Sequence, residues 1–208
     1  MRVLIADDHA ILRKGLIEIL NESFPGLEYF EASTGLEAVQ ISRKEALDLV
    51  LLDISMPGRN GLDALKQIKS DGSKAKILIL SVQPEDQYAL RVLKAGASGF
   101  LNKDSAPEEL LNAVRIVMNG KKYISETIAE KLAHALSSPF DKPLYENLSD
   151  RELQVVQLIA SGKTVSEIAR ELSLTVNTIS TYRARILEKL QLNNNAEVTR
   201  YALDNNLV

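Results

Sequence analysis

The 208-residue chain contains no cysteine, so disulfide bridges and thiolate metal sites are excluded. No apolar run reaches the length of a membrane-spanning helix, and the apolar start of the chain meets acids at Asp7 and Asp8, which excludes a secretory signal core. No glycine-rich turn follows this first run, which argues against a dinucleotide-binding protein. We therefore expect a soluble cytoplasmic protein.

An excess of positive charge is also missing. The formal net charge is −3, and residues 145–208 hold seven Lys or Arg against eight Asp or Glu. A nucleic-acid-binding protein with this balance must use a local basic patch rather than bulk charge. The length suits two small domains, and 45% hydrophobic with 25% charged residues is typical of globular proteins.

The first 120 residues alternate between short apolar runs and helical periodicity. The apolar runs predict strands, and each is followed by the apolar spacing of an amphipathic helix. The predicted strands are residues 3–6, 27–32, 49–52, 77–80 and 98–101, and the predicted helices are residues 10–20, 35–46, 62–69, 85–93 and 107–118. This alternation predicts an α/β fold, with a doubly wound five-stranded parallel sheet covered by helices on both faces.

The rest of the chain predicts helices only. One helix is expected from Ile124 to Leu136, followed by a proline-punctuated segment from Ser137 to Pro143. A smaller all-α domain of four helices then follows, with Ser149, Thr164 and Thr175 as expected caps of the first three. The expected division is a domain at 1–120, a linker with a helix at 121–147 and a helical domain at 148–208.

Polar side chains follow the predicted strands at the edge where ligands bind in parallel sheets. They are Asp7, Asp8, Asp53, Ser81 and Lys103. Carboxylates this close repel one another, and a Mg²⁺ ion held by oxygen ligands relieves that repulsion. We expect Asp8 and Asp53 to bind the ion directly, Asp7 to bind it through water, and the backbone carbonyl of Ser55 to be a further ligand.

The free oxygen of Asp53 is then the expected acceptor of a phosphoryl group, because phosphoryl transfer needs mainly charge neutralisation and alignment. Lys103 would place positive charge on the phosphoryl oxygens, and the Ser81 hydroxyl would donate a hydrogen bond. An isolated Asp at a strand end is more often a helix cap, and an isolated Lys is more often a surface residue. The combination at successive strand ends favours a site.

These residues form part of a longer pattern. It consists of Asp7-Asp8, Asp53-x-x-Met56-Pro57-x-x-x-Gly61, Ser81 and Ala95-Gly96-Ala97-x-Gly99-Phe100-x-x-Lys103. The pattern resembles the CheY-like receiver domain of two-component response regulators over residues 1–120. The resemblance implies that Asp53 is the phosphoacceptor and that a histidine kinase or phosphotransfer protein is the donor. It also implies that Phe100 turns inward as Ser81 moves toward the phosphoryl group, although Phe100 taken alone is a core residue.

The third helix of the C-terminal domain carries hydroxyl and basic side chains. Four helices with a tight turn between the second and third suit a helix-turn-helix, whose third helix lies in the major groove. The expected DNA-binding residues are Thr178, Ser180, Thr181, Tyr182, Arg183, Ala184, Arg185 and Lys189. Standing alone, this segment would be an ordinary amphipathic helix with a solvated polar face.

Further motifs in this half extend the pattern. They are Leu148-Ser149-x-Arg151-Glu152, Gly162-Lys163-Thr164-x-x-Glu167-Ile168-Ala169-x-x-Leu172, Thr178-Ile179, Ile186 and Lys189-Leu190. They resemble the LuxR-type domain, and the whole chain resembles the NarL/FixJ class of response regulators, nearest the GacA/UvrY-like branch. The resemblance implies a phosphorylation-dependent transcriptional regulator, which is a switch rather than an enzyme. Its implied partners are double-stranded DNA with an inverted-repeat operator and, when phosphorylated, a second copy of the chain.

The chain departs from the LuxR-type pattern on the DNA-binding helix. Family members often carry Lys where this chain has Ser180 and His where it has Tyr182, so direct base contacts are expected to differ. In such domains the last helix usually forms the dimer. Val198, Tyr201 and Ala202 are therefore expected in dimerisation, with core packing as an equal alternative.

Two other functions stay open at this stage. A Mg²⁺-dependent phosphatase with an aspartyl nucleophile would use a similar sheet, but it is favoured by an acid two residues after Asp53, where this chain has Ser55. A regulator whose helical domain binds another protein is compatible with the nearly neutral C-terminal charge. Salt-dependent DNA affinity distinguishes it from a DNA-binding protein.

Overall fold

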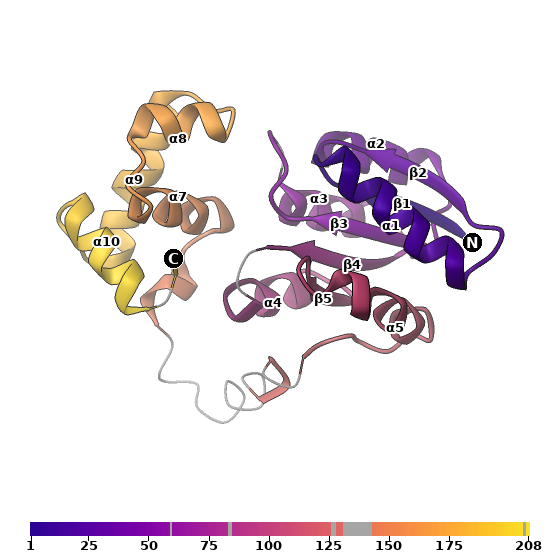
Figure 1. The fold of residues 1–208 in the computed structure, drawn as a ribbon. Helices are drawn as coiled ribbons and strands as arrows, with labels where there is room; N and C mark the ends of the chain where they lie inside the picture. Colours follow the sequence, from indigo (N-terminus) through magenta and orange to yellow (C-terminus); the bar gives the residue numbers. More distant parts are fainter. Residues whose placement is uncertain (59, 83–84, 126–127, 131–142, 206) are drawn as a thin grey trace. The chain divides into compact units, whose positions relative to one another are not determined.

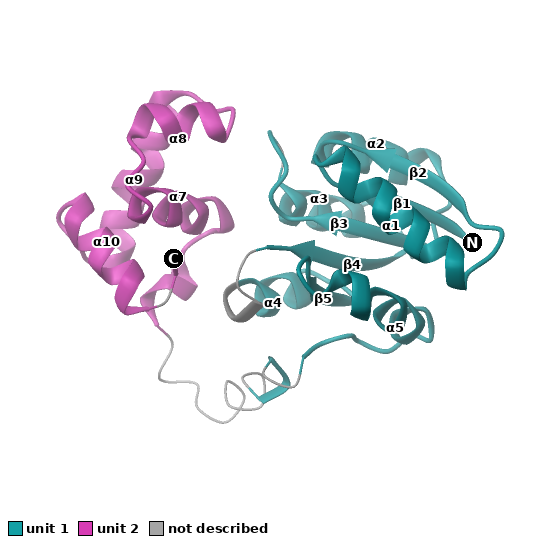
Figure 2. Ribbon diagram, viewed as in Figure 1, with its two compact units in different colours: residues 1–136 teal, residues 137–208 magenta. Residues whose placement is uncertain are grey.

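The computed structural model describes residues 1–58, 60–82, 85–125, 128–130, 143–205 and 207–208. The chain divides into two compact units, residues 1–136 and residues 137–208 (Figure 2). The helix predicted from Ile124 to Leu136 and the proline-punctuated segment after it lie largely outside the described residues; residues 128–130 are helical.

The first unit alternates strands and helices along the chain (Figure 1). The strands are β1 (Arg2–Ala6), β2 (Glu28–Ala32), β3 (Leu49–Asp53), β4 (Lys76–Ser81) and β5 (Gly99–Asn102), and the helices are α1 (Ala10–Ser23), α2 (Gly35–Lys44), α3 (Gly61–Ser70), α4 (Glu85–Lys94) and α5 (Ala106–Met118). The sheet order is β2-β1-β3-β4-β5, and all neighbouring strands are parallel. The predicted doubly wound five-stranded sheet is confirmed.

Helices cover both faces of this sheet. One face packs against α1 and α5, where alternate strand residues such as Val3 and Ile5 join Leu16 and Val114 in a buried cluster. The intervening strand residues, such as Leu4, are also fully buried, and α2, α3 and α4 lie on their side of the sheet (Figure 1). Burial on both faces explains why β1, β3 and β4 are continuous apolar runs rather than alternating ones.

The second unit contains helices only. They are a 3₁₀ helix η1 (Leu144–Asn147) and the α-helices α7 (Asp150–Ala160), α8 (Val165–Glu171), α9 (Val176–Leu190) and α10 (Asn195–Asp204). The three predicted caps are confirmed: Ser149 and Thr164 form capping boxes with Glu152 and Glu167, and Thr175 accepts a hydrogen bond from the Thr178 amide. Each box satisfies amide groups that the first helical turn leaves without a partner.

A short turn joins α8 to α9. It begins after Leu172, and Ser173 adopts a left-handed conformation with φ 54°, which is uncommon for a residue other than glycine. Thr175 then caps α9. This is the tight turn that the helix-turn-helix prediction required. Among the described residues, no helix is long and apolar enough to span a bilayer.

Candidate functional site

The predicted acidic residues lie together at the carboxyl ends of the central strands. Asp7 directly follows β1, Asp53 is the last residue of β3, and Lys103 directly follows β5. Asp7 is 1% exposed and Asp53 is fully buried, whereas Asp8 is exposed at the rim. Parallel strands end on the same edge of a sheet, so residues distant in sequence are brought into one place.

Lys103 is placed between two of the carboxylates. Its Nζ lies 2.6 Å from Asp7 Oδ2 and 2.8 Å from Asp53 Oδ2, and its side chain is only 8% exposed. Each oxygen is thus paired with the ammonium group, and neither has a further hydrogen-bond partner among the described residues. The other oxygen of Asp53 accepts a hydrogen bond from the Ser55 amide at 3.1 Å.

Burial and charge act in opposite directions on this group. Burial raises the pKa of Asp53 above its ordinary value of 3.8, and the attraction of Lys103 offsets only part of that rise. Burial alone would lower the pKa of Lys103, but the charge of Asp53 and hydrogen bonds to Asp53 and Asp7 outweigh it and raise the pKa. The ammonium group is therefore held in its charged form beside the carboxylates.

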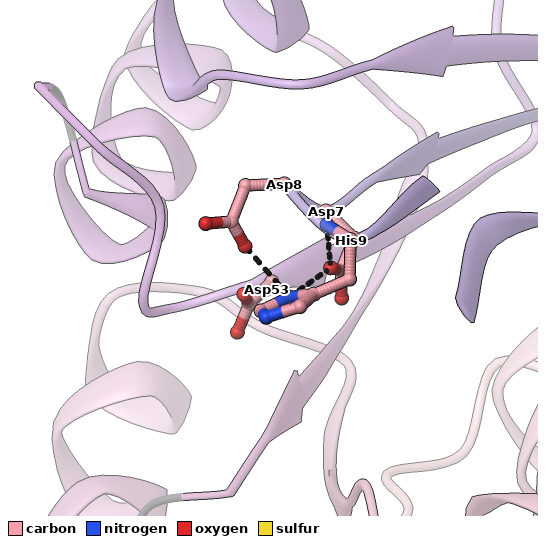
Figure 3. A group of neighbouring side chains, drawn as sticks. All are labelled: Asp7, Asp8, His9 and Asp53. Atoms are coloured by element: carbon pink, nitrogen blue, oxygen red, sulfur yellow. Dashed lines mark hydrogen bonds and ion pairs between the residues drawn. The ribbon is translucent and has the colours of Figure 1, made fainter. Parts of the chain in front are cut away.

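His9 and Arg13 join the site although the sequence reasoning did not single them out. The His9 Nδ1 atom lies 3.0 Å from Asp7 Oδ1 and 2.9 Å from Asp8 Oδ1 (Figure 3). The His9 amide also donates to Asp7 Oδ1 at 2.7 Å. Arg13 donates to the Asp7 carbonyl oxygen at 2.7 Å and to Glu31 on β2 at 2.7 Å. The position of His9 directly after the two acids was the signal that could have identified it.

The remaining predicted receiver residues lie on the neighbouring strands β4 and β5 and in the loop after β3. Ser81 is the last residue of β4 and is fully buried, and its carbonyl accepts a hydrogen bond from the Lys103 amide at 2.9 Å. Phe100 on β5 is 1% exposed, so its ring is inside the unit in this structure. Ser55 is half-buried in the loop after β3.

Gly61 is tightly packed against the phosphoacceptor candidate. A Cβ atom at Gly61 would lie 1.8 Å from the Asp53 carbonyl oxygen, which no real side chain tolerates. The Gly61 amide also donates to the Ile54 carbonyl at 3.0 Å. The glycine of the Asp-x-x-Met-Pro-x-x-x-Gly pattern is thus required because α3 starts directly against the end of β3.

The donor set fits a hard divalent cation. Ligand atoms of Asp7, Asp8, His9 and Asp53 all lie within 4.8 Å of one another. Among the described residues, the buried oxygens Asp7 Oδ2 and Asp53 Oδ2 have no partner other than the Lys103 ammonium, so each keeps the capacity to bind a further group. Carboxylate oxygens at a cluster of this kind match the ligand preference of Mg²⁺.

The predicted DNA-binding residues on α9 differ in exposure. Ser180, Thr181, Ala184 and Arg185 are exposed and recur at the three- and four-residue spacing of one helix face. Thr178 is half-buried, and its hydroxyl lies 2.8 Å from that of Thr175. The face available to a ligand is therefore built mainly from small polar side chains and one exposed guanidinium.

The other three predicted DNA-binding residues are partly engaged within the unit. Arg183 donates from Nε to the Asn195 side chain at 2.5 Å, and Tyr182 is half-buried. Lys189 Nζ lies 2.6 Å from Glu152 Oε2, and the Glu152 side chain is only 3% exposed. The sequence did not predict this ion pair, which joins α9 to the start of α7.

Two of the three predicted dimerisation residues lie in the core. Val198 and Ala202 on α10 are fully buried in a helix that packs against α7. This burial contradicts their predicted role in dimerisation, because a fully covered side chain cannot contact a second chain. Tyr201 is half-buried, and its hydroxyl accepts a hydrogen bond from the Tyr145 amide at 3.1 Å. Leu203 beside them is 59% exposed.

Comparison with known proteins matches both units. A model for the response regulator receiver domain matches residues 3–115, and a model for bacterial regulatory proteins of the luxR family matches residues 146–202. The response regulator UvrY of Escherichia coli K12 is 38% identical over 100% of this chain and 95% of its own length. The response regulator GacA of Pseudomonas aeruginosa PAO1 is 34% identical over 100% of this chain and 98% of its own.

A solved structure is similar over almost the same span. It is RcsB of Salmonella enterica serovar Typhimurium, bound to promoter rprA in the presence of the phosphomimetic BeF₃⁻. That chain is 26% identical, the match covers 97% of each chain, and the TM-score is 0.66. The similarity therefore extends beyond either unit alone.

Proposed function

The chain belongs to the response regulators that join a receiver domain to a LuxR-type DNA-binding domain, and we propose that Asp53 is its phosphoacceptor. One observation carries this assignment: the buried Asp53 carboxylate at the end of β3 lies 2.8 Å from Lys103 Nζ, which also lies 2.6 Å from Asp7. A buried carboxylate with a raised pKa and a fixed charged partner is typical of a functional group rather than a structural one.

The chemistry needs little from the protein beyond placement and charge. An Asp53 oxygen attacks the phosphorus of a phosphohistidine or of acetyl phosphate, the bond to the donor breaks, and Asp53 becomes an acyl phosphate. Lys103 neutralises the negative oxygens of the transferred group, since its Nζ already lies 2.8 Å from Asp53 Oδ2. A Mg²⁺ ion held by Asp8, Asp53, Asp7 through water and the Ser55 carbonyl would supply further positive charge.

The members of this family are switches rather than enzymes with an external product. Attack of water on the acyl phosphate returns the Asp53 carboxylate and inorganic phosphate, and we include this slow self-hydrolysis in the proposal. The Ser81 hydroxyl donates to the phosphoryl group, and Phe100 follows its movement. In this structure Phe100 is already inside the unit.

The assignment is tested by phosphoprotein formation. The purified chain is mixed with acetyl phosphate, with and without Mg²⁺, and separated by phosphate-affinity electrophoresis. A shifted band that needs Mg²⁺ and is absent in Asp53→Ala supports the assignment. A shift of equal size in Asp53→Ala would place the phosphoryl group elsewhere.

The C-terminal domain is proposed to bind the major groove of double-stranded DNA through α9. Support comes from the exposed face of Ser180, Thr181, Ala184 and Arg185 and from the LuxR-type match. Arg183, Tyr182 and Lys189 are already engaged or partly covered, so we assign them to flanking phosphate contacts and to holding α9 in place. Thr178 at the start of α9 is proposed to contact a phosphate.

The DNA proposal is tested by selection of operators from random duplexes, with and without acetyl phosphate and Mg²⁺. Enrichment of an inverted repeat would support binding by a homodimer. If acetyl phosphate increases this enrichment in the unmodified chain but not in a variant without Asp53, the homodimer binds when phosphorylated. Affinity should fall as salt rises, because phosphate contacts release counterions. Binding that is indifferent to salt would favour a protein partner instead.

The remaining parts of the proposal concern organisation. We keep the division into a receiver at 1–120, a linker at 121–147 and a DNA-binding domain at 148–208, supported by the end of α5 at Met118 and the cap at Ser149. The exposed side of α10, with Leu203 and the edge of Tyr201, replaces Val198 and Ala202 as the proposed dimer surface. We also propose that a cognate histidine kinase or phosphotransfer protein is the phosphoryl donor and that the protein is cytoplasmic.

A further inference from the structure

The segment that follows α5 is hydrogen-bonded to the outer edge of the sheet. β5 is the last strand in the described order, so its far edge is available for pairing. The Tyr123 amide donates to the Ser98 carbonyl at 3.0 Å, and the Phe100 amide donates to the Tyr123 carbonyl at 3.2 Å. These bonds form a parallel bridge between Gly99 and Tyr123. Residues 121–125, which we term the edge segment, therefore extend the sheet by a short strand-like step.

Side chains fasten the edge segment as well. The Tyr123 hydroxyl donates to Glu109 Oε2 on α5 at 2.6 Å, and the Tyr123 ring packs against the core under that helix. Lys122 Nζ donates to the carbonyl of Ala97, two residues before β5. The contacts reach both β5 and α5, so the edge segment is held by the two elements that end the receiver domain.

Gly99 is the residue that permits this close approach. A Cβ atom at Gly99 would lie 2.6 Å from the Tyr123 carbonyl oxygen and 2.8 Å from Tyr123 Cβ. Both of these atoms belong to the edge segment, and one of them is backbone, which cannot rotate away. The third nearest atom is Leu78 Cδ1 on β4 at 3.0 Å, the end of a side chain that can shift by a few tenths of an ångström. Glycine inside a strand often marks such a close backbone approach. The space beside Gly99 is therefore shaped for the edge segment.

The same strand leads directly to the phosphorylation site. Lys103 follows β5 immediately, and its Nζ lies 2.8 Å from Asp53 Oδ2. Its amide is bonded to the Ser81 carbonyl at 2.9 Å. Three positions earlier, Phe100 has its ring inside the receiver and its amide bonded to the edge segment. One four-residue strand thus contacts both the site and the start of the linker.

From this arrangement we propose that the edge segment couples the receiver to the DNA-binding domain. Phosphorylation of Asp53 draws Lys103 and β5 toward the phosphoryl oxygens, which weakens the bonds of β5 to residues 121–125. All residues of the DNA-binding domain follow this segment in the chain, so its release frees the start of the linker. The coupling rests on the proposed phosphorylation of Asp53, and it requires two states that the phosphoryl group distinguishes.

The first test follows amide hydrogen exchange in the full-length chain, with and without acetyl phosphate and Mg²⁺. Phosphorylation is measured in the same samples by phosphate-affinity electrophoresis. The amides of Tyr123 and Phe100 are expected to exchange about fivefold faster or more in the phosphorylated protein, while amides of β2 at the opposite sheet edge stay unchanged. Phosphorylated protein with unchanged exchange at both amides overturns the coupling. Absence of phosphorylation contradicts the proposed function instead, so the two failures are distinguishable.

The second test uses Gly99→Ala, which displaces the edge segment without changing a site residue. Its phosphorylation rate should stay within about twofold of the unmodified chain, while the gain in operator affinity on phosphorylation, typically about 5–150-fold for such couplings, should nearly vanish. Gly15→Ala is the matched control, because a Cβ atom there meets nothing within 4 Å. A Gly99→Ala protein that retains the full gain overturns the proposal.

Tyr123→Phe covers the case in which Gly99→Ala does not fold. It removes only the hydroxyl bond to Glu109 and keeps the backbone bridge. Faster exchange of residues 121–125 before phosphorylation, with a reduced gain in affinity, supports the coupling. A loosened edge segment with the full gain overturns it.

Discussion

Each domain contains a buried carboxylate, and the pKa values of the two are shifted in opposite directions. Asp53 in the receiver and Glu152 in the DNA-binding domain are 0% and 2% exposed. Burial raises the pKa of Asp53, and Lys103 compensates only in part. Burial alone would also raise the pKa of Glu152, but hydrogen bonds from Lys189 and Ser149 outweigh it and hold that pKa below 4.5.

The difference lies in what each carboxylate oxygen contacts. Glu152 Oε2 accepts from the Ser149 amide at 2.7 Å and from Lys189 at 2.6 Å, so its charge is matched within the folded domain. Among the described residues, Asp53 Oδ2 has no partner other than Lys103, and it shares that cation with Asp7. A carboxylate whose pKa is lowered on folding stabilises the fold above that pKa, whereas an incompletely matched one leaves an oxygen able to take up a new group.

The largest effect, a complete loss of phosphorylation, is expected when the incompletely matched carboxylate of Asp53 is removed. Asp53→Asn should abolish phosphoryl incorporation, because an amide nitrogen or oxygen does not form a stable acyl phosphate. It should also leave the free energy of unfolding of the receiver unchanged or higher, since a poorly solvated charge is removed. Phosphate-affinity electrophoresis and denaturant unfolding measure the two effects. A clear loss of stability would mean that Asp53 is as well matched as Glu152.

Removal of Lys103, the cation shared by Asp7 and Asp53, should have the next largest effect. Lys103→Met is expected to slow phosphorylation by about 10²-fold, the usual cost of losing one preorganised stabilising group. Initial rates with acetyl phosphate at saturating Mg²⁺ measure it, and Lys44→Met, at an exposed position on α2, is the control. Equal rates in the two variants would show that Lys103 only balances charge in the resting protein.

Loss of the ion pair between Glu152 and Lys189 should lower the stability of the DNA-binding domain without changing phosphorylation. Glu152→Gln is expected to lower the free energy of unfolding of the DNA-binding domain by about 1–3 kcal/mol, because a hydrogen bond to a charged partner is lost. Phosphorylation of Asp53 should be unaffected. Glu188→Gln, on the exposed side of α9, is the matched control and should be nearly neutral. If Glu152→Gln leaves the free energy of unfolding unchanged, Glu152 does not stabilise its domain and the contrast with Asp53 is wrong.

The smallest effect is a pH dependence with a definite sign. The pKa of Glu152 is lowered in the folded domain, so its stabilisation is fully present above 4.5 and is lost as pH falls through the lower folded value. The difference in unfolding free energy between the unmodified chain and Glu152→Gln should therefore shrink from pH 6 to pH 3. Unfolding curves at several pH values provide the measurement, and a constant difference would contradict the cause assigned to the shift.

The sequence predicted those features that depend on strand order or on contacts between near neighbours. Asp7, Asp53 and Lys103 could be placed together because parallel strands end on one edge, whatever the details of packing. The caps at Ser149 and Thr164 were predictable because each involves a residue only three positions away. The apolar runs predicted all five strands to within a few residues of their observed bounds.

Contacts that depend on how elements pack were not predictable. The bond between Lys189 and Glu152 joins residues on different helices, and periodicity does not specify which polar groups meet. Val198 and Ala202 fitted a core and a dimer surface equally well, because both are apolar on one helix face. Their burial against α7 could be decided only in three dimensions. The edge segment was missed because its pairing to β5 leaves no apolar alternation in the sequence.

The side-chain caps and the acidic site also differ in when they can form during synthesis. Each cap in the second unit needs residues three positions apart, whereas the acidic site draws on residues from Asp7 to Lys103. At ribosomal speeds of roughly 5–20 residues per second, Lys103 emerges about 5–20 s after Asp7. Asp7, Asp8 and Asp53 are therefore synthesised before their cation, and the site can be completed only after β5 and Lys103 have emerged.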